Sequence, residues 1–486
     1  MRHYRRSSTS IVTRAGLVLI VLCTFGTRLA YYASDPDPRT GPWVYGAMAH
    51  NIISGGHWFQ VNANAGSEFS FNTPMPVREL RGKQGLLVAP AEANLKYADA
   101  HPRWEPFNAE PVGEAVLLAG VWEITGSQTY LPDVLMKTVL DALAALLVYR
   151  VVMLLYRRRR AALAAGLFYA LYPPIAYIVV NPNRDIWSLD FTIAVLAGFV
   201  EATNSRHPRR WLVACGVLVG IGAYFDPNAL LLPGAMAFAS VTVTGWRTAL
   251  HRALIPTMIA ALMLTPWIIR NYNAYHTFVP TRTGLGQAMW EGLSEIQNSY
   301  GPTSYDYVSY LQVHRVRPDI HWGTPAYDSV LVNKTIALIE RHPLFYLNTI
   351  AHRIWISTIG ELEMGWMRRG TTIPSAYPRG RLAYVIEQPF QLIQVTLMPL
   401  IFLAAMAALG LTWVRYKREH LLLIAVAMAV GLPYLIVNTE ARYIMPISIV
   451  LLIWIAVGGD LLVERAYAWR RAKKRQIPVH PVDGQT

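Results

Sequence analysis

The sequence predicts an all-α membrane protein whose chain crosses a bilayer about ten times. Of the 486 residues, 53% are hydrophobic and only 15% are charged, and several apolar runs approach or exceed the roughly 20 residues needed to span a bilayer. The net charge of +14 does not indicate nucleic-acid binding, because the Lys and Arg residues stand beside the ends of these runs. Both cysteines, Cys23 and Cys215, lie inside apolar runs, which argues against a disulfide framework and a Cys-ligated metal site.

The order of apolar runs and basic loops predicts the topology. An arginine-rich start precedes the apolar run 15–32, which Arg28 interrupts and which no small-x-small cleavage site follows, so we expect an uncleaved first helix with a cytoplasmic N-terminus. Pro173 and Pro174 should kink or end a helix near the outer face. With both termini inside, every short basic loop is cytoplasmic and two long polar segments lie outside. The other spans are expected at residues 131–156, 161–180, 186–203, 211–225, 229–244, 253–269, 389–414, 421–437 and 443–463.

This topology divides the chain into three parts. Residues 1–270 form an N-terminal transmembrane module whose first external loop covers residues 33–110. Residues 271–386 form an external helical segment, a small subdomain in its own right. Residues 387–486 form the C-terminal transmembrane helices and a basic cytoplasmic tail.

Several helices are predicted outside the spans. Residues 43–53 carry apolar side chains at helical spacing, so we expect an amphipathic helix on the outer membrane surface. Residues 62–108 are rich in Pro, Gly and Asn and indicate an irregular loop in which short strands could occur. The run 111–124 is too short for a span and favours a re-entrant or interfacial helix. Residues 326–341 and 343–357 each show the pattern of an amphipathic helix.

Several acids and arginines lie at the predicted outer ends of the spans or in the turns that join them. A carboxylate beside a guanidinium at one membrane face suits a reaction in which the acid is a general base and the arginine binds an anion. The alternative is a set of turn-forming residues, since an acid before a proline is a common turn signal. The residues concerned are Asp35, Asp37, Asp185, Asp226, Arg270, Glu440 and Arg442.

The stretch 264–280, LTPWIIRNYNAYHTFVP, predicts the outer end of one span. Trp267 suits the headgroup level, and Arg270 follows three residues later, so its guanidinium should stay at the membrane face. The forked donors of an arginine suit a phosphate. The alternative is an interfacial anchor whose guanidinium group snorkels to water and binds no ligand.

Two ionisable residues lie inside the second span. Lys137 and Asp141 are four residues apart on one helix face, and we expect them to neutralise each other as an ion pair. The alternative is a functional site, because ionisable residues inside a membrane are commonly functional. Asp190, about one turn into its span, could face the outer cavity. No histidine pair has zinc-ligand spacing and no phosphate-binding glycine loop is present, so an activated substrate would be carried by a membrane lipid phosphate.

Three stretches carry a resemblance to a known family. They are YGAMAHNIISGGHWF at 45–59, LTPWIIRNYNAYHTFVP at 264–280 and EARYIMP at 440–446. Residues 113–174 show the same order of features as this family, with Gly126 before a span and Tyr172-Pro173-Pro174 at a span end. In this order the chain resembles the polytopic GT-C glycosyltransferases related to protein O-mannosyltransferases and the aminoarabinose transferases of lipid A.

The resemblance implies a GT-C fold and an inverting transfer of a hexosyl or pentosyl group from a polyprenyl-phosphate donor to an acceptor at the outer membrane face. The family's catalytic acid would fall at Gly41, so the nearest acids, Asp37 and then Asp35, are the expected base. No metal, cofactor or nucleic acid is implied. The remaining assignments are Asp185 as a second catalytic acid, Arg270, Asn271 and Arg442 as lipid-phosphate ligands, and Tyr45, Asp226 and Glu440 as lining of the donor and acceptor pocket.

We therefore expect an enzyme of the bacterial inner membrane in which Arg270 and Arg442 meet Asp37, Asp35 or Asp185 in one pocket. Its partners are the lipid-linked donor, membrane lipid and a glycan, lipid or protein acceptor. Two alternatives remain. A lipid-linked sugar transporter or flippase would place its polar site near the bilayer midplane, where only Lys137, Asp141 and the proline kink support it. A non-catalytic relative is supported by Gly41.

Overall fold

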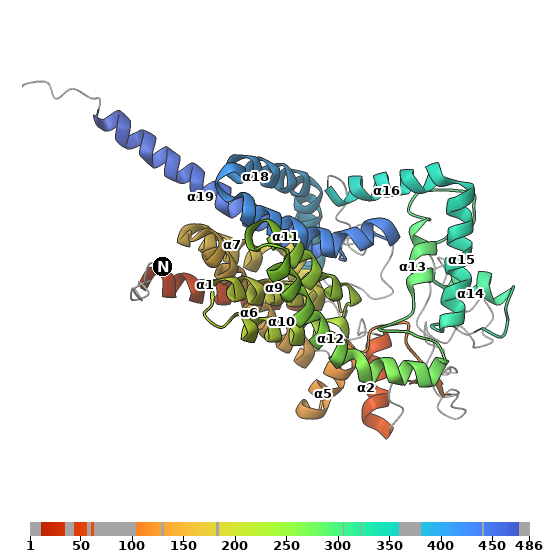
Figure 1. The fold of residues 1–486 in the computed structure, drawn as a ribbon. Helices are drawn as coiled ribbons and strands as arrows, with labels where there is room; N and C mark the ends of the chain where they lie inside the picture. Colours follow the sequence, from red (N-terminus) through yellow and green to blue (C-terminus); the bar gives the residue numbers. More distant parts are fainter. Residues whose placement is uncertain are drawn as a thin grey trace, which may run out of the picture.

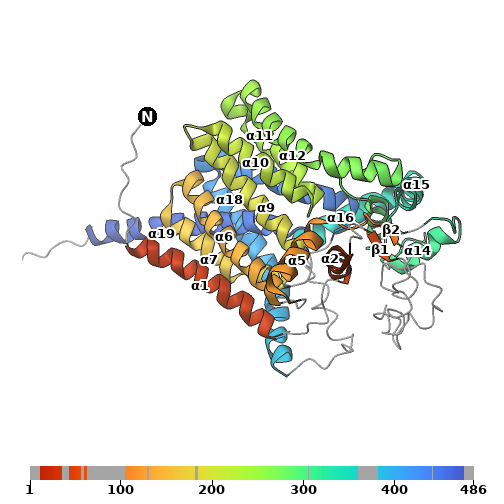
Figure 2. The same cartoon turned by 90° about the horizontal axis from the view of Figure 1, so that it is seen from below.

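The structure is a computed structural model of the 486-residue chain. It describes residues 11–34, 43–55, 60–62, 104–127, 131–180, 184–304, 306–320, 322–358, 381–439 and 442–475. A helical bundle carries a group of shorter helices at one end (Figure 1). Helix α1 begins and helix α19 ends on the same side of the bundle, away from these shorter helices (Figures 1 and 2).

The N-terminal part of the bundle consists of the first helix and eight later elements that follow one another with short connections. Its elements are α1 (Ile11–Ser34), α6 (Leu131–Tyr156), α7 (Arg159–Leu171), α8 (Pro173–Val180), α9 (Asp185–Asn204), α10 (Pro208–Ala223), η1 (Pro227–Leu231), α11 (Leu232–Thr244) and α12 (Trp246–Tyr275). The predicted kink is confirmed, because α7 and α8 are bent by 50° at Pro173. Proline has no N–H for the helical ladder, and its ring clashes with the preceding turn.

The chain is a multi-pass membrane protein. Six helices among the described residues are long and apolar enough to cross a bilayer, and the bent pair α7–α8 would make a seventh. Helix α10 has 16 residues and α11 has 13, so these two are shorter than an ordinary span. The number of about ten crossings therefore stays a prediction.

The C-terminal part consists of α18 (Arg381–Val437) and α19 (Met445–Arg475). Helix α18 reverses its direction at Tyr416, whose φ of −131° is not helical. Before the bend its residues run parallel to α19, since Ala408 lies against Gly458 and Arg415 lies across a cavity from Arg465. After the bend the direction is antiparallel, since His420 lies beside Trp454 and Gly431 lies against Ile447. Helix α18 is thus two helices in a hairpin, as expected from the two predicted spans 389–414 and 421–437.

One apolar core holds the bundle together. It contains Ile20 of α1, residues of α6 to α11, and the facing sides of α18 and α19. Small residues allow close helix approach, as in other membrane bundles. A Cβ on Gly216 of α10 would lie 2.9 Å from the Pro256 carbonyl oxygen of α12, so only glycine fits this contact.

The shorter elements lie at one end of the bundle. Helix α2 packs on α5 through Tyr45, Met48 and Leu118, while Trp290, Tyr327 and Leu331 join α13 to α15. The predicted helices at 43–53, 326–341 and 343–357 are confirmed, and the strands β1 and β2 form an antiparallel pair. The elements are α2 (Trp43–Gly55), β1 (Gln60–Asn62), β2 (Trp104–Pro106), α5 (Gly113–Thr125), α13 (Leu285–Gly292), α14 (Asp306–His314), α15 (Pro325–Arg341) and α16 (Pro343–Thr358).

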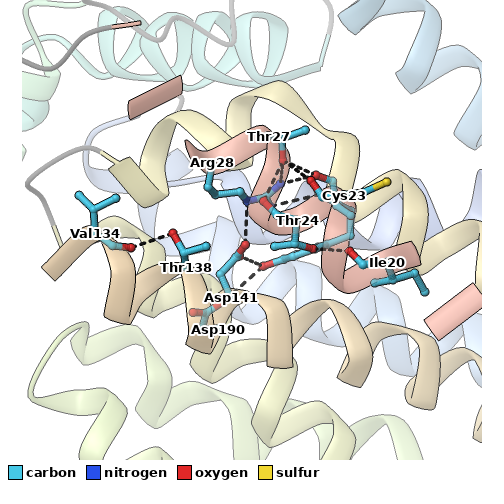
Figure 3. Close-up of polar contacts among 11 residues, drawn as sticks. Ile20, Cys23, Thr24, Thr27, Arg28, Val134, Thr138, Asp141 and Asp190 are labelled. Carbon is cyan, nitrogen blue, oxygen red and sulfur yellow. Dashed lines mark hydrogen bonds and ion pairs between the residues drawn. The ribbon is translucent and has the colours of Figure 1, made fainter. Parts of the chain in front are cut away.

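The expected ion pair between Lys137 and Asp141 is wrong. Asp141 instead pairs with Arg28 of α1, whose Nε lies 2.8 Å from Oδ2 (Figure 3). Lys137 pairs with Glu114 of α5 and lies 3.0 Å from Asp133, four residues away on the other side. The two residues share a helix face, but helices that pack there bring stronger partners to each of them. All five side chains are fully buried, so each charge needs such a partner.

Candidate functional site

A partly buried carboxylate, Glu110, whose side chain is 26% exposed, lies where four segments meet. The Tyr45 hydroxyl of α2 donates to Glu110 Oε2 over 2.8 Å. Arg184 Nε, at the start of α9, lies 3.4 Å from the same oxygen. Arg282 Nη1, in the segment after α12, lies 3.5 Å from it. One carboxylate therefore holds two guanidinium groups that are distant in the sequence.

Charge keeps Glu110 ionised. Burial works against ionisation, but the charges of Arg184 and Arg282 and the Tyr45 hydrogen bond hold the pKa of the Glu110 carboxyl below its ordinary value. Burial and the Glu110 charge raise the pKa of Tyr45 well above its usual value, so its hydroxyl stays a neutral donor. Burial also opposes the charge of Arg184, yet the neighbouring Tyr45 and Glu110 oxygens raise the pKa of its guanidinium overall.

A second acid–arginine pair lies beside the first. Arg442, which follows α18, has its Nε 3.7 Å from Oδ2 of Asp185, the first residue of α9. The Arg442 charge also contributes to the lowered pKa of Glu110, which places the two pairs within electrostatic reach. We call these six residues the Glu110 cluster: Tyr45, Glu110, Arg184, Asp185, Arg282 and Arg442.

Asp226 stands at the edge of this cluster. Its Oδ1 accepts from the Asn228 amide over 3.0 Å and so caps η1, which is the turn-forming role considered from the sequence. Its Oδ2 accepts from the Tyr434 hydroxyl over 3.2 Å. The Tyr434 ring stacks on Tyr443 at 4.9 Å, and Tyr443 lies under the Arg442 guanidinium at 5.0 Å. A turn residue is thereby connected to the cluster through two aromatic rings.

Hydrogen bonds to two backbone carbonyls bring Arg282 to Glu110. The Thr283 amide donates to the Asn108 carbonyl over 2.9 Å, and Arg282 Nη1 donates to the Ala109 carbonyl over 3.1 Å. These bonds align the segment after α12 with the segment before α5. The Glu110 cluster therefore depends on two loop segments that run side by side rather than on one helix face.

Arg270 and Asn271 lie one step earlier along the same segment. The Asn271 amide nitrogen, which is fully buried, donates to the Val279 carbonyl over 2.9 Å, and its oxygen accepts from Arg270 Nη1 over 3.0 Å. The Arg270 guanidinium lies 4.9 Å from the Trp267 ring centroid. In the structure these side chains shape the turn that leads to Arg282. Their expected role as phosphate ligands stays a prediction.

Four positions used in the sequence argument lie outside the described residues. Asp35, Asp37 and Gly41 fall between the end of α1 and the start of α2, and Glu440 falls two residues before Arg442. The assignments of Asp37 and Asp35 as base and of Glu440 as pocket lining therefore stay predictions. Within the described ranges there is no group of three or more His, Cys, Asp or Glu side chains that could hold a metal ion.

Sequence reasoning missed Glu110, Arg184 and Arg282. Each of them had a local signal. Glu110 precedes Pro111 at the start of an apolar helix, Arg184 is next to the flagged Asp185, and Arg282 stands two residues after Pro280. The signal for their convergence was absent, because it depends on which loops meet in the folded chain.

Comparisons with known proteins agree with this architecture. Residues 109–269, about a third of the chain, match the family model described as dolichyl-phosphate-mannose-protein mannosyltransferase. The chain is also similar to the archaeal oligosaccharyltransferase AglB from Archaeoglobus fulgidus, solved with an inhibitory peptide and a dolichol-phosphate, with a TM-score of 0.52 and 12% identity over 96% of this chain. The chain has a GT-C fold.

The likeness to AglB shows the fold alone, because the identity is low. This chain spans about half the length of that protein, covering 52% of it. A second structure of the Archaeoglobus fulgidus oligosaccharyltransferase, a complex with Zn and sulfate, has a TM-score of 0.48 and 14% identity over 95% of this chain and 52% of that one. The comparison with curated proteins gave no match. The GT-C resemblance stated from the sequence motifs is confirmed at the level of the fold.

Proposed function

We propose that this GT-C protein transfers a sugar from a polyprenyl-phosphate-linked donor to an acceptor at the outer face of the membrane. The observation that carries the proposal is the Glu110 cluster, in which three guanidinium groups and two carboxylates converge at helix ends of a membrane bundle. The matched family is named for a dolichyl-phosphate sugar, and AglB was solved with dolichol-phosphate. Both names support a lipid-phosphate-linked donor.

The guanidinium groups would bind the phosphate of the donor. Negative charge grows on this phosphate as the bond to the sugar breaks, so fixed positive groups stabilise the transition state more than the ground state. Arg442 is the first candidate because Asp185 holds it at 3.7 Å, and Arg184 and Arg282 join it. Arg270 and Asn271 retain the phosphate-binding role that the motif predicts.

The proton of the acceptor needs a separate base. Glu110 is unsuitable, because its lowered pKa and its two arginine partners make it a weak proton acceptor. Asp37 or Asp35 would take the hydroxyl proton while the acceptor oxygen bonds to the sugar carbon and the lipid phosphate leaves, which inverts that carbon. Asp185 would orient Arg442. Tyr45, Asp226 and Glu440 would line the pocket.

The orientation follows from charge. The basic loops, among them Arg157–Arg160 and Arg415–Arg418, fall at the helix ends opposite the Glu110 cluster. The positive-inside rule would make these loops and both termini cytoplasmic, and the cluster would face the outside of a bacterial inner membrane.

Transfer can be measured in proteoliposomes with a radiolabelled polyprenyl-phosphate sugar. We expect Arg442→Gln to reduce the rate by roughly 10²–10³-fold, as for other groups that stabilise transition-state charge. The double variant Asp35→Asn, Asp37→Asn should abolish transfer. Arg317→Gln is the matched control, because this substitution removes the same charge from an arginine that pairs with Asp319 on the surface.

Undiminished transfer in the Arg442 variant would refute the role of the cluster. Undiminished transfer in the double aspartate variant would remove these acids from the mechanism. Movement of the labelled lipid across the membrane without a covalent product would identify a flippase instead.

A further inference from the structure

An open cavity of about 460 Å³ lies between the first arm of the α18 hairpin and α19. Helix α18 contributes Leu411, Val414 and Arg415, and α19 contributes Leu461 and Arg465 among others. Leu461 comes sixteen residues after Met445, about 24 Å along the helix from the end that adjoins the Glu110 cluster. The cavity is therefore remote from the proposed transfer site, at the end of the bundle where the basic loops gather.

The cavity carries excess positive charge. Its acidic residue, Glu464, accepts from Arg158 Nη2 over 2.6 Å, and Asp460 accepts from Arg158 Nε over 2.5 Å. The nearest partner of Glu464 is thus an arginine outside the cavity, and although the Arg415 charge also reaches Glu464, the two lining arginines outnumber this one lining acid. Arg415 and Arg465 line the cavity as exposed guanidinium groups, so an anion placed between them would gain two charge-assisted contacts.

The same cavity has an apolar wall. The Val414 side chain is 96% exposed and Leu411 is 44% exposed, and both lie at the end of a helix that is apolar enough to span the bilayer. Such exposure is unfavourable in water and ordinary against hydrocarbon. A wall of this kind beside two guanidinium groups matches a molecule with an anionic head and hydrocarbon tails. A soluble phosphate would use the arginines and leave the wall uncovered.

We propose that this cavity binds an anionic phospholipid of the leaflet at the basic end of the bundle. The phosphate lies between Arg415 and Arg465, and the first acyl methylenes lie along Leu411 and Val414. The occupant is a resident lipid and not the sugar carrier. Because Arg415 is adjacent to Tyr416, the bound lipid also links the bend of the α18 hairpin to α19.

The test uses the full chain in detergent, titrated with phosphatidylglycerol or phosphatidylcholine and observed by native mass spectrometry. Wild type should bind phosphatidylglycerol in preference to phosphatidylcholine. The double variant Arg415→Gln, Arg465→Gln should bind phosphatidylglycerol about tenfold or more weakly, since each arginine near a membrane surface contributes about one factor of five. The control Arg470→Gln, Arg471→Gln removes the same charge two turns or less further along α19 and should bind as wild type does.

A second variant tests the site without removing an arginine. Val414→Asp changes a side chain next to Arg415 at the end of the spanning helix, where a carboxylate can lie at headgroup level, so folding should persist. Its charge should weaken phosphatidylglycerol binding by repelling the phosphate. Equal losses of phosphatidylglycerol binding in the two arginine double variants would show that only the overall charge of the protein matters, and would overturn the proposal. So would equal binding of the two phospholipids by wild type, or preferential binding of polyprenyl phosphate at this cavity. None of these readouts depends on transfer activity.

Discussion

At the scale of single residues, Glu110 connects the electrostatics of the site to pH. Its pKa is lowered in the folded protein, so the stability that its ion pairs contribute is complete above the pKa of the unfolded chain, about 4.3. This contribution is lost as the pH falls through the lowered folded value. Protonation of Glu110 would leave the Arg184 and Arg282 guanidinium groups close together without the negative charge that offsets their repulsion.

We expect Glu110→Gln to unfold at a lower temperature than wild type at pH 7 and to lose less stability on acidification. The measurement is the thermal unfolding midpoint in detergent between pH 3 and pH 7. Glu123→Gln is the control, because Glu123 is exposed on α5 and should leave the profile unchanged. Parallel profiles for Glu110→Gln and wild type would show that another group governs the acid transition.

The residue scale also shows how far a sequence can define a site. Asp185 and Arg442 were chosen because they stand at helix ends on one predicted face, and the structure brings them to 3.7 Å. Arg282 was not chosen, since its contact with Glu110 requires two loops to lie side by side. Local pattern indicates which face carries the polar groups. The pairing within that face is a property of tertiary packing.

At the scale of elements, an ion pair connects α16, the turn after α13 and the end of α18. Arg353 Nε lies 2.7 Å from Glu295, and its Nη1 donates to the Leu435 carbonyl over 3.1 Å. Glu295 also accepts from the Thr439 amide over 2.8 Å. A cation at a helix C-terminus is favourable because the last carbonyls have no helical partner. This arrangement fixes the segment that leads, three residues later, to Arg442.

Gly292 at the end of α13 allows this approach. A Cβ at this position would overlap the Val437 carbonyl oxygen and lie 2.6 Å from Arg353 Nη2. We expect Gly292→Ala to destabilise the protein by about 1–3 kcal/mol through overpacking and to reduce sugar transfer by displacing Arg442. Thermal unfolding and the proteoliposome assay measure the two effects.

The matched control is Gly120→Ala in α5, where a Cβ would meet nothing within 4 Å. This variant should be neutral or slightly more stable, because alanine favours a helix over glycine. A Gly292→Ala protein as stable and active as the control would contradict the close approach.

Elements were more predictable than contacts. The helices at 43–53, 326–341 and 343–357 follow from the spacing of apolar residues, and the α7–α8 bend follows from Pro173. The α18 hairpin was also visible as two apolar runs around a basic stretch. The short β1–β2 pair was not placed in advance, because its two strands are about 40 residues apart and have no shared local pattern.

At the scale of the whole molecule, buried charges decide which helices belong together. Arg28 of α1 pairs with Asp141 of α6 (Figure 3), and the Tyr169 hydroxyl of α7 donates to the other Asp141 oxygen over 2.5 Å. Asp190 of α9 lies at the edge of this network, 3.3 Å from the same hydroxyl. Its Oδ2 is buried and makes no hydrogen bond within the described part of the chain.

We expect Asp141→Asn to destabilise the protein by about 3–5 kcal/mol, because it leaves the Arg28 charge buried without a counter-charge. Asp190→Asn removes a carboxyl that holds no arginine and should cost clearly less. The comparison is made by thermal unfolding of the two variants in the same detergent. Equal losses would show that Asp190 shares the Arg28 charge.

The Arg28–Asp141 pair also has a consequence for biogenesis. Helix α1 leaves the ribosome more than a hundred residues before Asp141 is synthesised, so its arginine must enter the lipid phase, or wait at the translocon, without its counter-ion. Arg28 therefore gains its partners only when α6 and α7 arrive, since it also donates to the Ala170 carbonyl of α7. A nascent chain truncated before Asp141 should keep α1 exposed to quality-control proteases, whereas one that includes α7 should protect it.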